Sequence, residues 1–113
     1  MISNTQIIKL VALILIVSAF SEVSAQNRLT RQAEDAMKRA TKFMVDEVSY
    51  NGGYLWHYLP DMSRRWGEME AYETMIWVQP PGTVSMAHTF LDAYELTGDP
   101  IYYNAAEKAI NAL

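Results

Sequence analysis

The chain has 113 residues, a net charge of −4 and no cysteine, and half of its residues are hydrophobic. The acidic balance argues against a protein that binds nucleic acid, because such a protein needs basic side chains to replace the counterions around the phosphates. The hydrophobic content exceeds that of disordered chains. The absence of cysteine excludes disulfides, thiolate metal sites and cysteine nucleophiles.

Residues 1–25 have the pattern of a secretory signal peptide. Lys9 precedes an almost unbroken apolar run over residues 10–19, and small residues follow it. Val23 and Ala25 occupy the two positions that signal peptidase recognises, so we expect a secreted or periplasmic protein without a stable membrane anchor after cleavage. The alternative is a membrane-spanning helix, which needs about 20 apolar residues, whereas this run supplies roughly half of that number.

The first helix of the mature chain is predicted from Thr30 to about Val48. Thr30 is a hydroxyl residue that can cap the free N–H groups at a helix start. Apolar residues then recur at steps of three and four, which places them on one face that we expect to be buried. They are Leu29, Ala33, Ala36, Met37, Ala40, Phe43, Met44 and Val48.

Two further helices are predicted, over residues 83–97 and from residue 100 to the end. Gly98 can adopt the left-handed conformation that ends a helix, Asp99 can cap the next helix, and Pro100 suits its first position. So short a connection predicts a tight antiparallel hairpin. Its expected inward residues are Met86 or Ala87, Phe90, Leu91 and Tyr94, and then Ile101, Ala105, Ala109, Ile110 and Leu113.

Residues 49–83 form a connection far longer than is usual between helices. It holds all three tryptophans and four of the seven tyrosines of the chain. Because disordered linkers are poor in aromatic residues, we expect this loop to be folded. Asn51-Gly52-Gly53 predicts a turn at its start.

Two short strands are predicted in this loop. The first would follow the turn and put Tyr54, Trp56 and Tyr58 on one side. The second would run from Thr74 to Gln79 and pair with the first. Residues 60–73 would then be a polar excursion between the two strands.

The loop is also the candidate binding site. Aromatic rings can cover the apolar face of a sugar. Charged side chains such as the arginine guanidinium can bind hydroxyls or uronate carboxylates through parallel hydrogen bonds. The candidate substrate-binding residues are Tyr54, Trp56, Tyr58, Arg64, Arg65, Glu68 and Trp77. The alternative is that the rings pack over one end of a helical bundle, and that the arginines pair on the surface with Glu68 or Glu70.

The residues predict no metal site and no catalytic residue. His88 and Asp92 are four residues apart, but no third ligand is evident. The glutamates of the loop lack the spacing of a calcium-binding loop. An arginine acting as a base would have to lose a proton from a group whose pKa is about 13.

Three segments resemble the amino-terminal part of secreted bacterial (α/α)-toroid proteins related to pectate lyases. They are residues 52–58 (GGYLWHY), 77–83 (WVQPPGT) and 97–106 (TGDPIYYNAA). The last pattern recurs in many toroid enzymes that act on sugars and therefore concerns the fold. Residues 77–83 are rarer and favour the pectate-lyase-like group. The resemblance extends over residues 30–113.

The resemblance implies a mainly α fold, with helical hairpins of an incomplete (α/α) toroid and a small β-containing loop between the first two helices. Residues 26–113 would be the amino-terminal portion of the toroid domain, truncated at Leu113, where no helix stop signal stands. The implied reaction is β-elimination of polyuronate, in which calcium binds the uronate carboxylate and an arginine removes the neighbouring proton. The implied partner is an acidic polysaccharide or oligosaccharide.

None of the family's catalytic residues can be placed on this segment, so we expect the segment by itself to be inactive. Two alternatives stay open. One is a glycoside hydrolase of the same toroid class, which needs two carboxylates at a set separation. The other is a noncatalytic helical module that binds a glycan or a partner through the aromatic loop.

Overall fold

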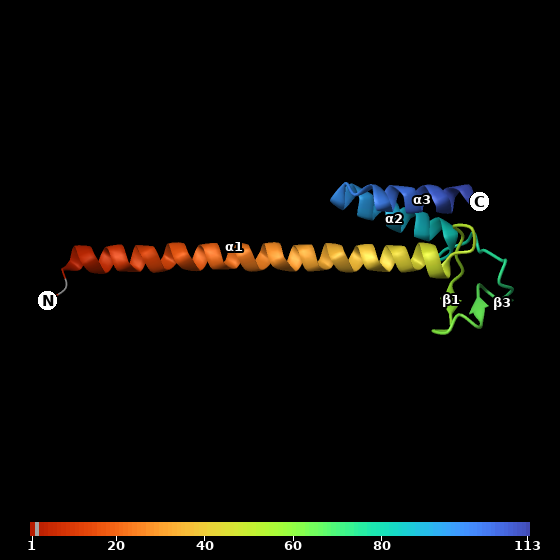
Figure 1. The fold of residues 1–113 in the computed structure, drawn as a ribbon, viewed down its shortest axis with the longest axis horizontal. Coiled ribbons are helices and arrows are strands. Elements are labelled where there is room, and N and C mark those ends of the chain that lie inside the picture. Colours follow the sequence, from red (N-terminus) through yellow and green to blue (C-terminus); the bar gives the residue numbers. More distant parts are fainter. Residues whose placement is uncertain (2) are drawn as a thin grey trace. The chain divides into compact units, whose positions relative to one another are not determined.

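The computed structural model describes residue 1 and residues 3–113, in two units, Met1–Ala36 and Met37–Leu113. Most of the chain is helical, as predicted (Figure 1). A small three-stranded sheet follows the first two helical segments in the sequence and precedes the last two. The elements in chain order are α1 (Asn4–Phe43), the π-helical turn η1 (Met44–Val48), β1 (His57–Tyr58), β2 (Arg65–Trp66), β3 (Glu70–Ala71), α2 (Thr83–Thr97) and α3 (Pro100–Asn111).

Helix α1 begins at Asn4 and not at Thr30, where the sequence analysis placed its start. The Thr30 hydroxyl donates a hydrogen bond to the carbonyl of Gln26 one turn earlier, at 3.1 Å, as hydroxyl residues inside helices do. The stretch Asn4–Val48 contains an 18-residue window of mean hydropathy 2.1, which is long and apolar enough to cross a membrane. A signal sequence near the N-terminus meets the same criterion, so this finding fits both alternatives.

Helices α2 and α3 lie side by side as the predicted antiparallel hairpin (Figure 1). Gly98 ends α2 with a φ of +68°, and its N–H donates to the Tyr94 carbonyl at 2.7 Å. The Asp99 carboxylate accepts a hydrogen bond from the Ile101 N–H at 3.1 Å, and Pro100 is the first residue of α3. The connection can be this short because these residues satisfy the backbone groups that two helix ends leave open.

The core of the second unit lies between the end of α1, η1 and the hairpin. Its buried residues are Val48, Tyr54, Ala87, Phe90, Ala105, Ala106 and Ala109. The prediction for the hairpin is confirmed at Ala87, Phe90, Ala105 and Ala109. It is wrong for Tyr94, Ile110 and Leu113, which are exposed. The buried residues of α3 are the large Tyr102 and three small alanines, Ala105, Ala106 and Ala109.

The predicted apolar face of α1 is buried only at its C-terminal end. Met44 packs against the core and Val48 is buried, whereas Met37, Ala40 and Phe43 are exposed. Leu29, Ala33 and Ala36 belong to the first unit and are exposed there. Other residues near the end of α1 face the hairpin instead. Thr41 is buried, and the Lys38 ammonium pairs with the Asp99 carboxylate at 2.6 Å.

The loop between η1 and α2 opens with the predicted turn. Tyr50 and Gly53 exchange both backbone hydrogen bonds, at 3.0 and 2.9 Å. Between them Asn51 and Gly52 have φ values of +50° and +91°. Both values lie in the left-handed region that this kind of hairpin turn requires.

The predicted strand from Thr74 to Gln79 is wrong, since this segment forms no strand in the structure. Its Trp77 N–H donates to the Tyr54 carbonyl of the first segment, 2.9 Å away. The Trp77 carbonyl accepts from the Thr83 N–H at 2.7 Å, which ties the segment to the start of α2. Strands β2 and β3 instead lie inside residues 60–73, so the expected excursion supplies two thirds of the sheet.

Candidate functional site

Tyr54, the first of the candidate residues, belongs to the core. Its side chain is 1% exposed and contacts the Phe90 ring edge to face, with ring centroids 6.0 Å apart. Burial raises the pKa of the phenol to about 12. The Tyr54 backbone is anchored as well, because its N–H donates to the Thr83 hydroxyl at 3.0 Å. For this ring the packing alternative holds. Tyr58 packs against the same core cluster, whereas Trp56 meets Trp77.

Trp56 and Trp77 come from distant parts of the loop and form a second aromatic group. Their rings meet edge to face, with centroids 6.1 Å apart. The Trp56 indole N–H donates to the Gln79 backbone carbonyl at 3.0 Å, and the Trp77 indole N–H donates to the Gln79 side-chain carbonyl at 3.3 Å. Both rings are half-buried. Their orientation is therefore fixed by the protein, while part of each ring reaches the surface.

The pairing of the three strands separates the remaining candidates onto two faces of the sheet. Trp66 is paired with His57 on one side and with Glu70 on the other, whereas Arg65 is paired with Tyr58 and Ala71. Paired residues of antiparallel strands share a face, and neighbours along a strand alternate. One face therefore carries His57, Trp66 and Glu70, to which Arg64 is added two residues before Trp66. We call these four residues the outer sheet face.

The outer sheet face holds a stacked and paired arginine. The Arg64 guanidinium lies 5.1 Å from the centroid of the Trp66 ring. Its Nε and Nη2 donate to the two Glu70 carboxylate oxygens at 2.7 and 2.8 Å. The Arg64 and Glu70 side chains are 56% and 51% exposed. Hydrogen bonding to Arg64 lowers the pKa of Glu70 from its ordinary value of 4.5.

The opposite face of the sheet contacts the core. Tyr58 packs against the core cluster, and the Arg65 guanidinium lies 5.9 Å from the Tyr58 ring centroid. Arg65 also donates to the Met62 carbonyl at 2.9 Å, and the Tyr58 phenol oxygen accepts from the Leu55 N–H at 2.6 Å. Burial raises the pKa of Tyr58. Tyr58 thus joins the sheet to the core, and Arg65 lies on the same face of the sheet as Tyr58.

The structure divides the seven candidates into three groups. Trp56 and Trp77 are brought together, Arg64 and the exposed Glu68 lie at the solvent side of the sheet region, and Tyr54, Tyr58 and Arg65 are turned toward the core. Trp66 was not among the candidates. Glu70 was expected only as a surface partner of the arginines, and for Arg64 this alternative is confirmed. Arg64 and Trp66 are two residues apart, and a glutamate follows four residues after Trp66. Once strands are assigned to residues 65–71, this pattern puts the three side chains on one face of the sheet.

The residues of this region do not form a metal centre. Within the part of the chain that the structure describes, no group of three or more His, Cys, Asp or Glu side chains is arranged to hold a metal ion. His88 and Asp92 on α2 are both exposed. We therefore assign to this segment no ligands for the calcium that the toroid resemblance implies.

No protein-family model, curated protein sequence or solved structure matches the chain.

Proposed function

We propose that the outer sheet face binds an acidic oligosaccharide. The observation that carries the proposal is Arg64, which lies over the Trp66 ring and holds a carboxylate by two parallel hydrogen bonds at a solvent-exposed position. Bidentate binding of a planar carboxylate is the recognition mode in which arginine is most specific. A uronate carboxylate has the same shape and charge as the Glu70 carboxylate that Arg64 now holds.

The Trp66 ring supports a sugar ligand over a simple anion. Trp66 stands beside Arg64 on the outer sheet face, and its ring is half-buried. What such a ring offers to a ligand is apolar surface, which matches the C–H face of a pyranose. An aromatic ring beside a guanidinium that binds carboxylates through two hydrogen bonds is suited to a sugar acid.

The wider function that we propose is that of a secreted carbohydrate-active protein of the pectate-lyase-like type. This step is supported by the signal-peptide pattern of residues 1–25, by the α2–α3 hairpin and by the resemblance of the three segments to (α/α)-toroid proteins. In this proposal residues 26–113 contribute a substrate-binding surface. The elimination chemistry belongs to hairpins of a longer protein.

The binding step can be tested with the full chain in zwitterionic detergent micelles. Oligogalacturonide is titrated while tryptophan fluorescence is recorded, and the neutral oligogalactose serves as the comparison ligand. Replacing Arg64 by Gln should weaken oligogalacturonide binding by about tenfold, because hydrogen bonds to charged groups are the strong ones. Arg39→Gln, which removes one charge from the exposed side of α1, should leave binding unchanged.

Equal affinity for the charged and neutral oligosaccharides would overturn the role of Arg64. A complete absence of binding would overturn the proposal. Binding without the release of unsaturated uronides from polygalacturonate in the presence of calcium is the expected result for this segment. Release of reducing sugar without those unsaturated products would favour the glycoside hydrolase alternative.

A further inference from the structure

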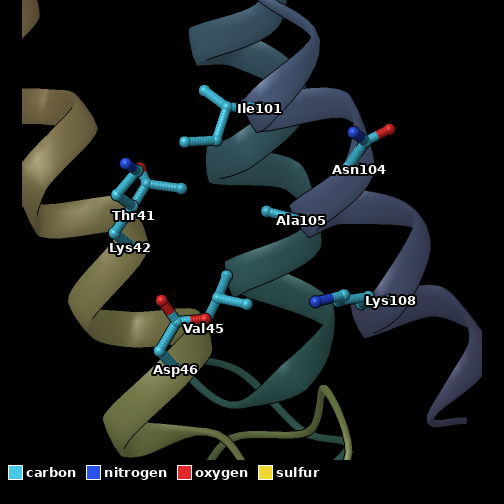
Figure 2. A pocket seen from close by; sticks show the side chains of 8 residues that line it. All are labelled: Thr41, Lys42, Val45, Asp46, Ile101, Asn104, Ala105 and Lys108. Atoms are coloured by element: carbon cyan, nitrogen blue, oxygen red, sulfur yellow. The ribbon is translucent and has the colours of Figure 1, made fainter.

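A groove separates the C-terminal part of α1 with η1 from α3, away from the sheet. Its cavity has a volume of about 250 Å³. The lining residues are Thr41, Lys42, Val45, Asp46, Ile101, Asn104, Ala105 and Lys108. All of them lie in the second unit, and Figure 2 shows the side chains of the two helical segments facing one another across the gap. We call this cavity the α1–α3 groove.

The floor and the rim of the α1–α3 groove differ in character. Val45, Ile101 and Ala105 supply aliphatic surface, and Ala105 is also part of the core. The rim carries the exposed polar side chains of Lys42, Asp46, Asn104 and Lys108. In Figure 2 Lys108 extends from α3 toward α1. An apolar floor with a few polar groups at its edge is the usual composition of a small-molecule site.

The charged groups at the rim form no ion pair among the described residues. Among the described residues the ion pairs are Lys38 with Asp99 and Arg64 with Glu70. Neither pair involves Lys42, Asp46 or Lys108. The groove thus has two ammonium groups and one carboxylate available to a ligand, with an excess of one positive charge.

We propose that the α1–α3 groove binds a small hydroxy acid, a molecule with one carboxylate, a neighbouring hydroxyl and an apolar body. The excess positive charge favours a monoanion, whose carboxylate Lys108 and Lys42 would hold. The Asp46 carboxylate can accept a hydrogen bond from the ligand hydroxyl, and its negative charge disfavours a ligand with two carboxylates. The Val45 and Ile101 side chains would cover the hydrocarbon part. This site is independent of the oligosaccharide surface proposed for the sheet.

Mandelate is a suitable probe because it combines a carboxylate, a hydroxyl and an apolar ring in one small molecule. It is titrated into the isotope-labelled full chain in zwitterionic micelles, and the amide proton–nitrogen NMR spectrum is recorded. We expect the amide signals of residues 41–46 and 101–108 to shift. Mandelamide lacks the charge and phenylacetate lacks the hydroxyl, so both should bind more weakly than mandelate.

Lys108→Gln should weaken mandelate binding about tenfold, since it removes a hydrogen bond between charged groups. Arg39→Gln removes the same charge outside the groove and should have no effect. Arg64→Gln should likewise leave mandelate binding unchanged, which separates this site from the outer sheet face. Because Lys108 is exposed, the variant should keep the wild-type spectrum away from the groove, so a loss of binding would not reflect unfolding.

Three results would overturn the proposal. Mandelate and mandelamide could bind equally well, Arg39→Gln could weaken binding as much as Lys108→Gln, or the shifted signals could lie outside the two segments. An absence of shifts at millimolar mandelate would overturn it as well.

Discussion

Arg64 holds its carboxylate partner at the surface, and this makes Glu70 an internal competitor for any acidic ligand. The two oxygens of Glu70 occupy the two guanidinium donors at 2.7 and 2.8 Å. A uronate can bind bidentately only after Glu70 has left. The affinity of the outer sheet face for acidic sugars should therefore depend on how strongly Glu70 is ionised.

We expect Glu70→Gln to increase the affinity for oligogalacturonide several-fold, because a neutral amide competes less well for Arg64. The pH dependence follows from the lowered pKa of Glu70. The ion pair is fully present above the ordinary pKa of the carboxyl and is lost as the pH falls through the lowered pKa. The advantage of the variant should consequently shrink on acidification. Calorimetric titration at several pH values measures both effects.

Glu107→Gln is the matched control for this experiment. Glu107 is exposed on α3, outside the sheet, and its replacement changes the net charge by the same amount. An equal gain in affinity from both variants would mean that overall charge, and not release of Arg64, governs binding.

Among the elements, the helix ends and the tight turn were the parts most readily predicted. Gly98, Asp99 and Pro100 each satisfy a local requirement of the backbone, and α2 ends and α3 begins where these residues require. The Asn51-Gly52 turn formed for the same reason. Signals of this kind act within a few residues and do not depend on what packs against them.

Gly98 and Gly52 offer a quantitative test of these turns, since both have positive φ but different surroundings. A methyl group at Gly98 would meet nothing, whereas one at Gly52 would collide with the Lys108 carbonyl. We expect Gly98→Ala to lower the free energy of unfolding by about 1 kcal/mol, from backbone strain alone. Gly52→Ala should lower it by about 3 kcal/mol, since steric overlap is added to the strain.

Urea unfolding of the full chain, followed by helical circular dichroism in the same detergent, compares the two variants. Equal losses of stability would show that the contact between the turn and the end of α3 contributes nothing. A larger loss for Gly98→Ala would contradict the packing described for Gly52.

The strands were the elements that local reasoning placed wrongly. Residues 74–79 have a suitable alternating pattern, but their backbone groups bond to Tyr54 and to the first residue of α2. The real partners, β2 and β3, are strands of two residues each, too short for a periodicity to be visible. Which segments pair as strands depends on the tertiary structure, because several backbone segments compete as partners. The sequence of a short polar segment does not show which partner it will have.

At the scale of the whole chain, the first question is whether residues 1–25 are removed. When the full chain is expressed with a bacterial export system, we expect the exported product to begin at Gln26, as determined by intact mass and N-terminal sequencing. Ala25→Arg should block processing because signal peptidase requires a small residue there. Ala33→Arg, the same change further along α1, should not affect it.

A spanning helix would give a different result. The protein would keep its N-terminal residues, would remain in the membrane fraction after alkaline extraction, and would not respond to Ala25→Arg. The hydropathy of the Asn4–Val48 stretch satisfies both alternatives, so processing is the observation that separates them.

The sequence by itself determined the helical character of the chain, the α2–α3 hairpin and the Asn51-Gly52 turn, because caps, glycines and turn residues act locally. The tertiary structure alone decided which side chains are available at the surface. It buried Tyr54 against Phe90, turned Tyr58 and Arg65 toward the core, and placed Arg64 between Trp66 and Glu70. Which side chains of the sheet reach the surface depends on the strand register, because a shift of one residue exchanges the two faces of a sheet.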